Sequence, residues 1–194
     1  MGRPRTTPDA VVLEAAALVF RQKGAAKFTL AHVANEVGLA PATLIQRFGS
    51  KRGLLLAIAR VAAEGADASL EMIRATHRSP LSALFAYFDH MAQVAETPET
   101  LANSLAFLQI DLTGPEFRRW TLQHYGAIDD AYQALLEDAI AARELKRCDV
   151  TALSRLITAT LHGALIFWAL VQEGTALAWL RRDMEALLAP YRAV

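Results

Sequence analysis

The amino-acid sequence predicts an all-α protein of about nine helices. Proline, glycine and helix-capping residues divide its 194 residues into stretches of helical length. No stretch alternates polar and apolar residues with the period of a half-buried strand. Hydrophobic residues make up 54% of the chain and charged residues 21%, which is enough apolar material for a sizeable core. The length suits a small N-terminal helical domain joined to a larger one.

The first third of the chain carries the signals of three short helices and the start of a longer one. Proline is favoured in the first turn of a helix, because its missing N–H would be unpaired there, and glycine is common after the last turn. Ser and Thr hydroxyls cap the free N–H groups at a helix start. We therefore expect helices near residues 9–24, 30–38, 41–48 and 51–73, with starts or caps at Pro8, Thr29, Pro41 and Ser50.

The remaining two thirds predict longer helices by the same signals. Thr113, Gly114 and Pro115 separate a helix that ends near Asp111 from one that runs to about Arg143. The final helix has a continuous apolar stripe, as expected for a helix with one face in a core. Further starts are expected at Ser79-Pro80, Thr97-Pro98, Asp149 and Thr175.

Charge is distributed unevenly along the chain. Residues 1–60 carry nine Lys and Arg against three Asp and Glu, whereas the rest carries eleven against seventeen. The formal net charge of zero therefore conceals about +6 in the first third and about −6 elsewhere. This asymmetry indicates a nucleic-acid partner for the basic part.

Residues 28–52 have the pattern of a helix-turn-helix DNA reader. Such a motif needs a tight turn, apolar residues that pin two helices together, and a polar face on the second helix. Gly38 suits the turn, because a positive φ costs glycine little. The pinning residues are expected to be Val33, Val37, Leu39, Leu44 and Phe48.

The second helix of this motif supplies candidate contacts to DNA. Arg pairs well with guanine and Gln with adenine, while Thr and Pro carbon atoms can touch thymine methyl groups. Helix starts near Thr29 and Lys51 can bind phosphates through N–H groups and the helix dipole. The candidate DNA-binding residues of the folded part are Thr29, Pro41, Ala42, Thr43, Gln46, Arg47 and Lys51.

The N-terminal GRPR segment adds Arg3 and Arg5 to these candidates. Arginines on a flexible arm can enter a narrow minor groove. The alternative is a disordered tail that contributes electrostatic attraction only.

Three segments resemble the N-terminal DNA-binding domain of the TetR family of bacterial transcriptional regulators. They are VLEAAALVFRQKG at 12–24, FTLAHVANEVGLAPATL at 28–44 and RFGSKRGLL at 47–55, including Lys51 after the recognition helix. The resemblance implies a DNA-binding domain at residues 1–50 and a helical effector-binding and dimerisation domain at 51–194. Two positions depart from the family pattern: Ile45 replaces an aromatic residue that commonly contacts a phosphate, and Ala40 replaces a polar cap.

The last two helices are expected to form a dimer interface. The segment 153–170 is apolar on nearly every side, so it must be covered all round, and one small domain covers only part of it. The resemblance implies a four-helix bundle with a second copy. The candidate interface residues are Leu161, Leu165, Trp168, Trp179 and Leu180, and the alternative is a large monomeric core.

The middle helices are candidates for binding a largely apolar small-molecule effector. Small-molecule sites are mostly apolar cavities with a few polar groups. The resemblance implies such a site, although residues at helical spacing belong to a core more often than to a pocket. The candidates are Phe88, Met91, Asn103, Phe107, Trp120, His124, Tyr125 and His162.

The sequence gives no positive sign of catalysis, of a metal site or of a cofactor. Its five histidines lack HxxxH and HExxH spacing, and Cys148 has no second cysteine. We expect a cytoplasmic protein, since no signal peptide and no uncharged 18-residue stretch is evident. The interpretation is a homodimeric repressor that binds a palindromic double-stranded operator and is released by its effector. Alternatives are an activator, a regulator that responds to a protein, or a ligand carrier or enzyme with a vestigial DNA-binding head.

Overall fold

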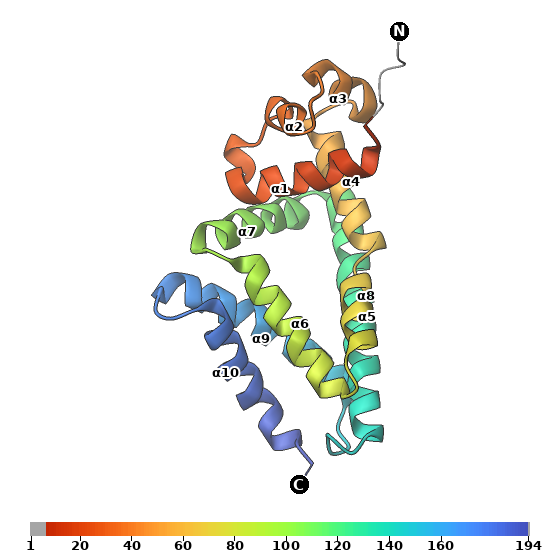
Figure 1. Ribbon diagram of the computed structural model, residues 1–194, viewed down its shortest axis with the longest axis vertical. Helices are drawn as coiled ribbons and strands as arrows, with labels where there is room; N and C mark the ends of the chain where they lie inside the picture. The colour runs from red at the N-terminus through yellow and green to blue at the C-terminus, as the bar shows by residue number, and fades with distance from the viewer. Residues whose placement is uncertain (1–6, 194) are drawn as a thin grey trace. The chain divides into compact units, whose positions relative to one another are not determined.

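The computed structural model describes residues 7–193, and these residues are helical almost throughout (Figure 1). Among them the only β-pairing is the isolated bridge between Leu145 and Arg192, which confirms the predicted all-α class. The helices are α1 (Asp9–Lys27), α2 (Leu30–Glu36), α3 (Pro41–Phe48), α4 (Lys51–Glu64), α5 (Ala68–Thr76), α6 (Pro80–Ala95), α7 (Pro98–Thr113), α8 (Pro115–Ala141), α9 (Val150–Val171) and α10 (Ala176–Leu188), with a final 3-10 turn at Ala189–Tyr191.

Side-chain caps occur where the sequence predicts them. The hydroxyl of Thr29 accepts a hydrogen bond from the N–H of His32 at the start of α2. Ser50 caps the start of α4 in the same way, through the N–H of Gly53. The expected caps of α6, α9 and α10 also form, at Ser79, Asp149 and Thr175.

The prediction of one continuous helix over 51–73 is wrong, because two helices cover this segment. α4 ends at Glu64 and α5 starts at Ala68, with a turn closed by the N–H of Ala68 and the carbonyl of Gly65. Glycine is a poor helix former, so a helix end here is favoured over continuation.

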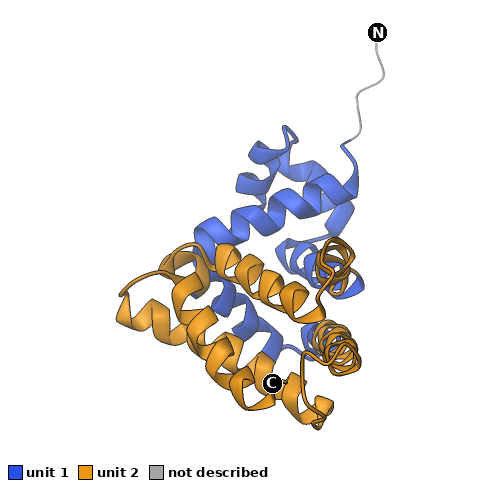
Figure 2. Ribbon diagram, turned by 60° about the horizontal axis from the view of Figure 1, so that its bottom comes forward, with its two compact units in different colours: residues 1–64, 102–121 blue, residues 65–101, 122–194 orange. Residues whose placement is uncertain are grey.

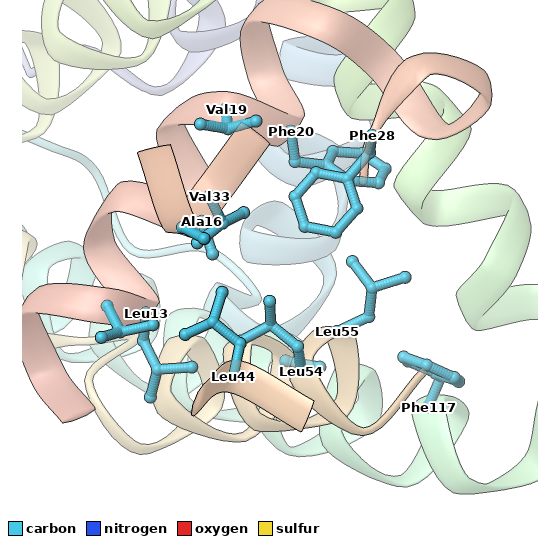
Figure 3. Packing of buried hydrophobic residues seen from close by; sticks show 13 residues of the cluster. Leu13, Ala16, Val19, Phe20, Phe28, Val33, Leu44, Leu54, Leu55 and Phe117 are labelled. Carbon is cyan, nitrogen blue, oxygen red and sulfur yellow. The ribbon is translucent and has the colours of Figure 1, made fainter. Parts of the chain in front are cut away.

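The chain divides into two compact units, coloured separately in Figure 2. The first unit contains α1 to α4 and residues 102–121, whereas the second contains residues 65–101 and 122–194. The first unit therefore extends beyond the expected boundary after residue 50. Its core explains why: Leu54 and Leu55 of α4 and Phe117 of α8 are buried in the same cluster as α1, α2 and α3 (Figure 3).

α1 is interrupted near its end by Gly24, which has φ +69° and ψ 170°. This backbone conformation is essentially restricted to glycine. Asn103, on α7, occupies the space beside it and donates a hydrogen bond from Nδ2 to the carbonyl of Arg21 at 2.7 Å. A Cβ at position 24 would collide with Oδ1 of Asn103.

In the second unit, α6, α9 and α10 bury their apolar faces against one another. By length and composition alone α9 could cross a membrane, a property that buried helices of soluble proteins share. Residues spaced along its whole length are buried in the second unit: Leu153, Ser154, Ile157, Leu161, Ala164, Leu165 and Trp168. This burial accounts for the apolar sequence of α9.

We predict that Gly24→Ala lowers the free energy of unfolding by about 1–3 kcal/mol, because alanine is strained in this conformation. Urea unfolding followed by circular dichroism measures the change. Gly126→Ala is the matched control: position 126 lies within α8 and an added Cβ there meets no atom within 4 Å. The free energy of unfolding of the control should rise by about 0.4–1 kcal/mol. Equal stability of Gly24→Ala and the natural chain would contradict the role given to Gly24.

Candidate nucleic-acid interface and effector cavity

α2 and α3 form a helix-turn-helix with the turn at residues 37–40. Gly38 has φ +66°, as the tight turn requires. The N–H of Leu39 donates to the carbonyl of Ala34 at 2.8 Å and closes the turn. Val33 and Leu44 are fully buried and hold the two helices on the core of the first unit.

The burial of Leu44 decides which side of α3 meets solvent. Leu44 points into the core beside Leu54 (Figure 3), and the opposite side of the helix is exposed. This exposed side, which we call the α3 outer face, consists of residues spaced three and four apart on a helix. The α3 outer face comprises Ala42, Ile45, Gln46 and Gly49, and Pro41 is exposed at its start.

Arg47, predicted to contact DNA bases, lies on the flank of α3 and is tied to α1. Its Nε donates to Oδ1 of Asp9 at 2.7 Å, and its Nη2 contacts the same oxygen. The Arg47 side chain is only 19% exposed, and its Nη1 is buried without a hydrogen-bond partner. Thr43, on the same flank, is half-buried as well.

The two predicted phosphate-contacting residues of the folded part are both exposed, at separate helix starts. Thr29 caps α2. The ammonium of Lys51, in the first turn of α4, donates to the carbonyl of Ala25 at 3.0 Å and lies 5.5 Å from the centre of the Phe28 ring. Arg3 and Arg5 lie outside the described residues.

The second unit contains a small, partly open cavity of about 60 Å³. Tyr125 and His162 form a hydrogen bond of 3.0 Å across it, and the other ring nitrogen of His162 is 2.8 Å from the carbonyl of Thr158. A backbone carbonyl only accepts, so Nδ1 carries the proton and Nε2 accepts from the Tyr125 hydroxyl. The lining comprises Tyr87, Met91, His124, Tyr125, Ile128, Tyr132, Thr158, Leu161 and His162.

Half of the eight residues predicted for the effector pocket line this cavity: Met91, His124, Tyr125 and His162. Phe88 is fully buried in the core next to it. The other three, Asn103, Phe107 and Trp120, belong to the first unit and pack against its core or α1. Tyr87 and Ile128 were missed, although each lies four residues before another lining residue and thus on the same helix face.

A larger open groove of about 540 Å³ lies elsewhere in the second unit. It contains Arg143, Arg181 and Arg192 beside Glu144 and Glu185. Arg181 is paired with Asp89, and Glu144 accepts the N–H of Leu81 at the start of α6. Its charged lining does not suit a largely apolar effector.

Four of the five predicted dimer residues are buried within the chain, and the fifth, Trp179, is half-buried. Leu161, Leu165, Trp168 and Leu180 are all buried in the second unit, and the indole N–H of Trp179 donates to the carbonyl of Glu173. Six other large apolar side chains of α9 and the start of α10 are exposed. We call them the α9 outer stripe: Leu156, Ile166, Phe167, Leu170, Val171 and Leu177.

Burial raises the pKa of two tyrosines that line the cavity. Desolvation holds the pKa of Tyr132 well above its ordinary value, and the nearby Tyr87 and a hydrogen bond to it add to the effect. Desolvation also raises the pKa of Tyr87, partly offset by the same hydrogen bond.

Comparison with known proteins shows what this arrangement is similar to. Residues 12–58 match the family model of bacterial regulatory proteins of the tetR family. That segment contains most of α1, all of α2 and α3, and the first half of α4. No curated protein sequence gives a significant match.

Solved structures extend the similarity to almost the whole chain. A TetR transcription regulator from Haloarcula marismortui has a TM-score of 0.78 at 17% identity, covering 94% of this chain and 97% of that chain. A TetR-family regulator from Agrobacterium tumefaciens gives 0.76 at 21% identity over 95% and 97%. The transcriptional regulator FadR from Bacillus subtilis, in complex with stearoyl-CoA, gives 0.73 at 17% identity over 94% and 98%. The chain thus has the fold of TetR-family transcription regulators, and the resemblance found in its sequence is confirmed.

We predict that the free energy of unfolding falls as the pH rises above about 10, the ordinary tyrosine pKa. The unfolded chain then loses phenolic protons that folded Tyr132 and Tyr87 keep, so folding becomes less favourable. Each such group contributes at most about 1.4 kcal/mol per pH unit. Urea unfolding at a series of pH values measures the slope. Tyr132→Phe should flatten it, and an unchanged slope would contradict the burial argument.

Proposed function

We propose that this protein is a cytoplasmic, homodimeric transcriptional repressor that binds a palindromic operator and is released by a small-molecule effector. The observation that carries the proposal is the α3 outer face, held outward by the buried Leu44 in a segment that matches the tetR family model. A helix exposed in this way can enter the major groove of duplex DNA.

The charge of the first third supports a DNA partner. Residues 1–60 have an excess of about six positive charges, and no Lys or Arg belongs to the α3 outer face. Contacts of Lys and Arg with phosphates provide affinity and position, while the outer face is left to read bases.

The α9 outer stripe supports a homodimer. Phe167 is 61% exposed and Leu170 73%, and these side chains lie on one face of α9 with Ile166 and Val171. A contiguous apolar patch of this kind is costly to leave in water and marks a protein interface. A second copy of the chain would also supply the second reader that a palindrome requires, about 34–36 Å from the first.

The tyrosine-lined cavity supports an effector site. FadR from Bacillus subtilis, whose structure is similar to this one, was solved in complex with stearoyl-CoA. At about 60 Å³ the cavity here is well below the roughly 300–1,000 Å³ of typical ligand pockets, so an effector would have to be very small or enlarge it.

Release by an effector needs only a modest energetic bias. A tenfold loss of operator affinity corresponds to about 1.4 kcal/mol of differential binding. A helix that belongs to both parts of the chain could transmit this bias. The helix expected over 51–73 is interrupted at residues 65–67, whereas α8 runs unbroken from residues of the first unit into residues of the second. Operator affinity measured with and without a bound effector tests this step, and equal affinities would contradict it.

The DNA-binding prediction is tested with Lys51→Ala and a duplex selected from genomic fragments of the source organism. The natural protein should show a steep fall of log K with log salt, because bound phosphates release counterions. Lys51→Ala should weaken binding to all sequences alike and reduce the salt slope by about one. Lys146→Ala is the control, since Lys146 is an exposed lysine of the second unit. Absence of salt-dependent duplex binding by the natural chain would contradict the function.

The dimer prediction is tested with Phe167→Glu. A charge in the middle of the α9 outer stripe should convert dimers to monomers, because it would be buried unpaired in the interface. Light scattering after size exclusion gives the mass directly. Met72→Glu is the control, since Met72 is 68% exposed on α5, outside the stripe. A monomeric natural chain, or equal masses for both variants, would refute the proposed interface.

A further inference from the structure

The α3 outer face offers unusual chemistry for a helix that reads DNA. Of its members, Gln46 is the only residue with a side-chain hydrogen-bonding group, and Ala42 and Ile45 are purely apolar. Ile45 is 52% exposed, which is a large apolar exposure for a small domain. The face therefore carries one amide and an aliphatic surface, with no charge.

Arg47 does not supply the missing charge. It is the only Lys or Arg between residues 28 and 50, so no other Lys or Arg of α2 or α3 could take its place on guanine. Its guanidinium is engaged by Asp9, with Nε 2.7 Å from Oδ1. The buried Nη1 and the low exposure of the side chain place the group between α3 and the start of α1 instead of on the outer face.

The side chains of Gln46 and Ile45 both match an A·T base pair. A glutamine side chain forms a bidentate pair with N6 and N7 of adenine in the major groove, and an apolar side chain contacts the thymine methyl group. Guanine is best read by Arg or Lys, which this face lacks. Residues 42 to 49 span about 10 Å along the helix, roughly three base-pair steps.

We propose that α3 reads A·T base pairs in the operator half-site, Gln46 on adenine and Ile45 on a thymine methyl group, while Asp9 holds Arg47 out of the groove. Arg47 and Asp9 are thus positioning residues that fix α3 against α1. The proposal rests on the proposed DNA-binding function and names the sequence class that the same surface would recognise.

Selection from a duplex library with a randomised centre provides the first test. The natural full-length chain should enrich half-sites with two to three adjacent A·T pairs. Gln46→Ala should lose the preference for adenine at one position by at least about fivefold. Arg47→Ala should lower affinity evenly and leave the preferred sequence unchanged. Gln46 and Ile45 are exposed, so their replacement leaves the core of the first unit intact.

Single-atom changes in the selected duplex provide the second test. Replacing the contacted thymine by uracil removes only its methyl group and should weaken binding about fourfold, the effect expected for one buried carbon. Replacing the adenine by 7-deazaadenine removes the N7 acceptor and should weaken binding at least about fivefold. The methyl effect should vanish in Ile45→Ala and the N7 effect in Gln46→Ala, with each substitution leaving the other effect in place.

The outcomes separate this inference from the function on which it rests. Salt-dependent binding to a site of G·C pairs, with preference lost in Arg47→Ala, would overturn A·T reading and leave the regulator intact. A·T reading by Gln46 and Ile45 would also be overturned if the natural chain prefers an A·T-rich site and both Gln46→Ala and Ile45→Ala keep the same sequence preference. Absence of any duplex binding would overturn both.

Discussion

The burial of Leu44 is the constraint on which the DNA-facing part of the structure depends. An isolated helix of eight residues is not stable in water, so α3 takes its place and its rotation from packing. Leu44 is fully buried in the core of the first unit, together with Val33 of α2 and Leu54 of α4. With that side chain fixed, Ala42, Ile45 and Gln46 must point outward, and Arg47 must lie on the flank where Asp9 binds it.

The features that sequence predicts well are local. The caps at Thr29, Ser79 and Thr175 each join residues three apart, so the residue types at that spacing nearly determine the bond. The all-α class and the helix-turn-helix follow from the same short-range signals. The break at residues 65–67 is also local, and Gly65 was the signal that could have predicted it.

The features that sequence does not predict join distant residues. Arg47 and Asp9 are 38 positions apart, and nothing local indicates that the arginine would be engaged by an acid instead of exposed to DNA. Asn103 likewise contacts a residue that is distant in sequence, because it donates to the carbonyl of Arg21 on α1. From the sequence alone, its polar side chain was predicted to contact an effector. α9 is apolar nearly all round, so composition alone could not separate the buried Leu161 from the exposed Phe167; only packing does so.

The central claim is that α3 lies in the major groove and places its outer face on the bases. Photo-crosslinking of a selected duplex in which bromouracil replaces thymine tests it most directly, because bromine takes the place of the methyl group. After trypsin digestion, the account predicts a crosslink within the peptide Phe28–Arg47, at Ile45 or its neighbours on α3. Crosslinks confined to residues 122–193, in a duplex that the protein binds specifically, would contradict the account.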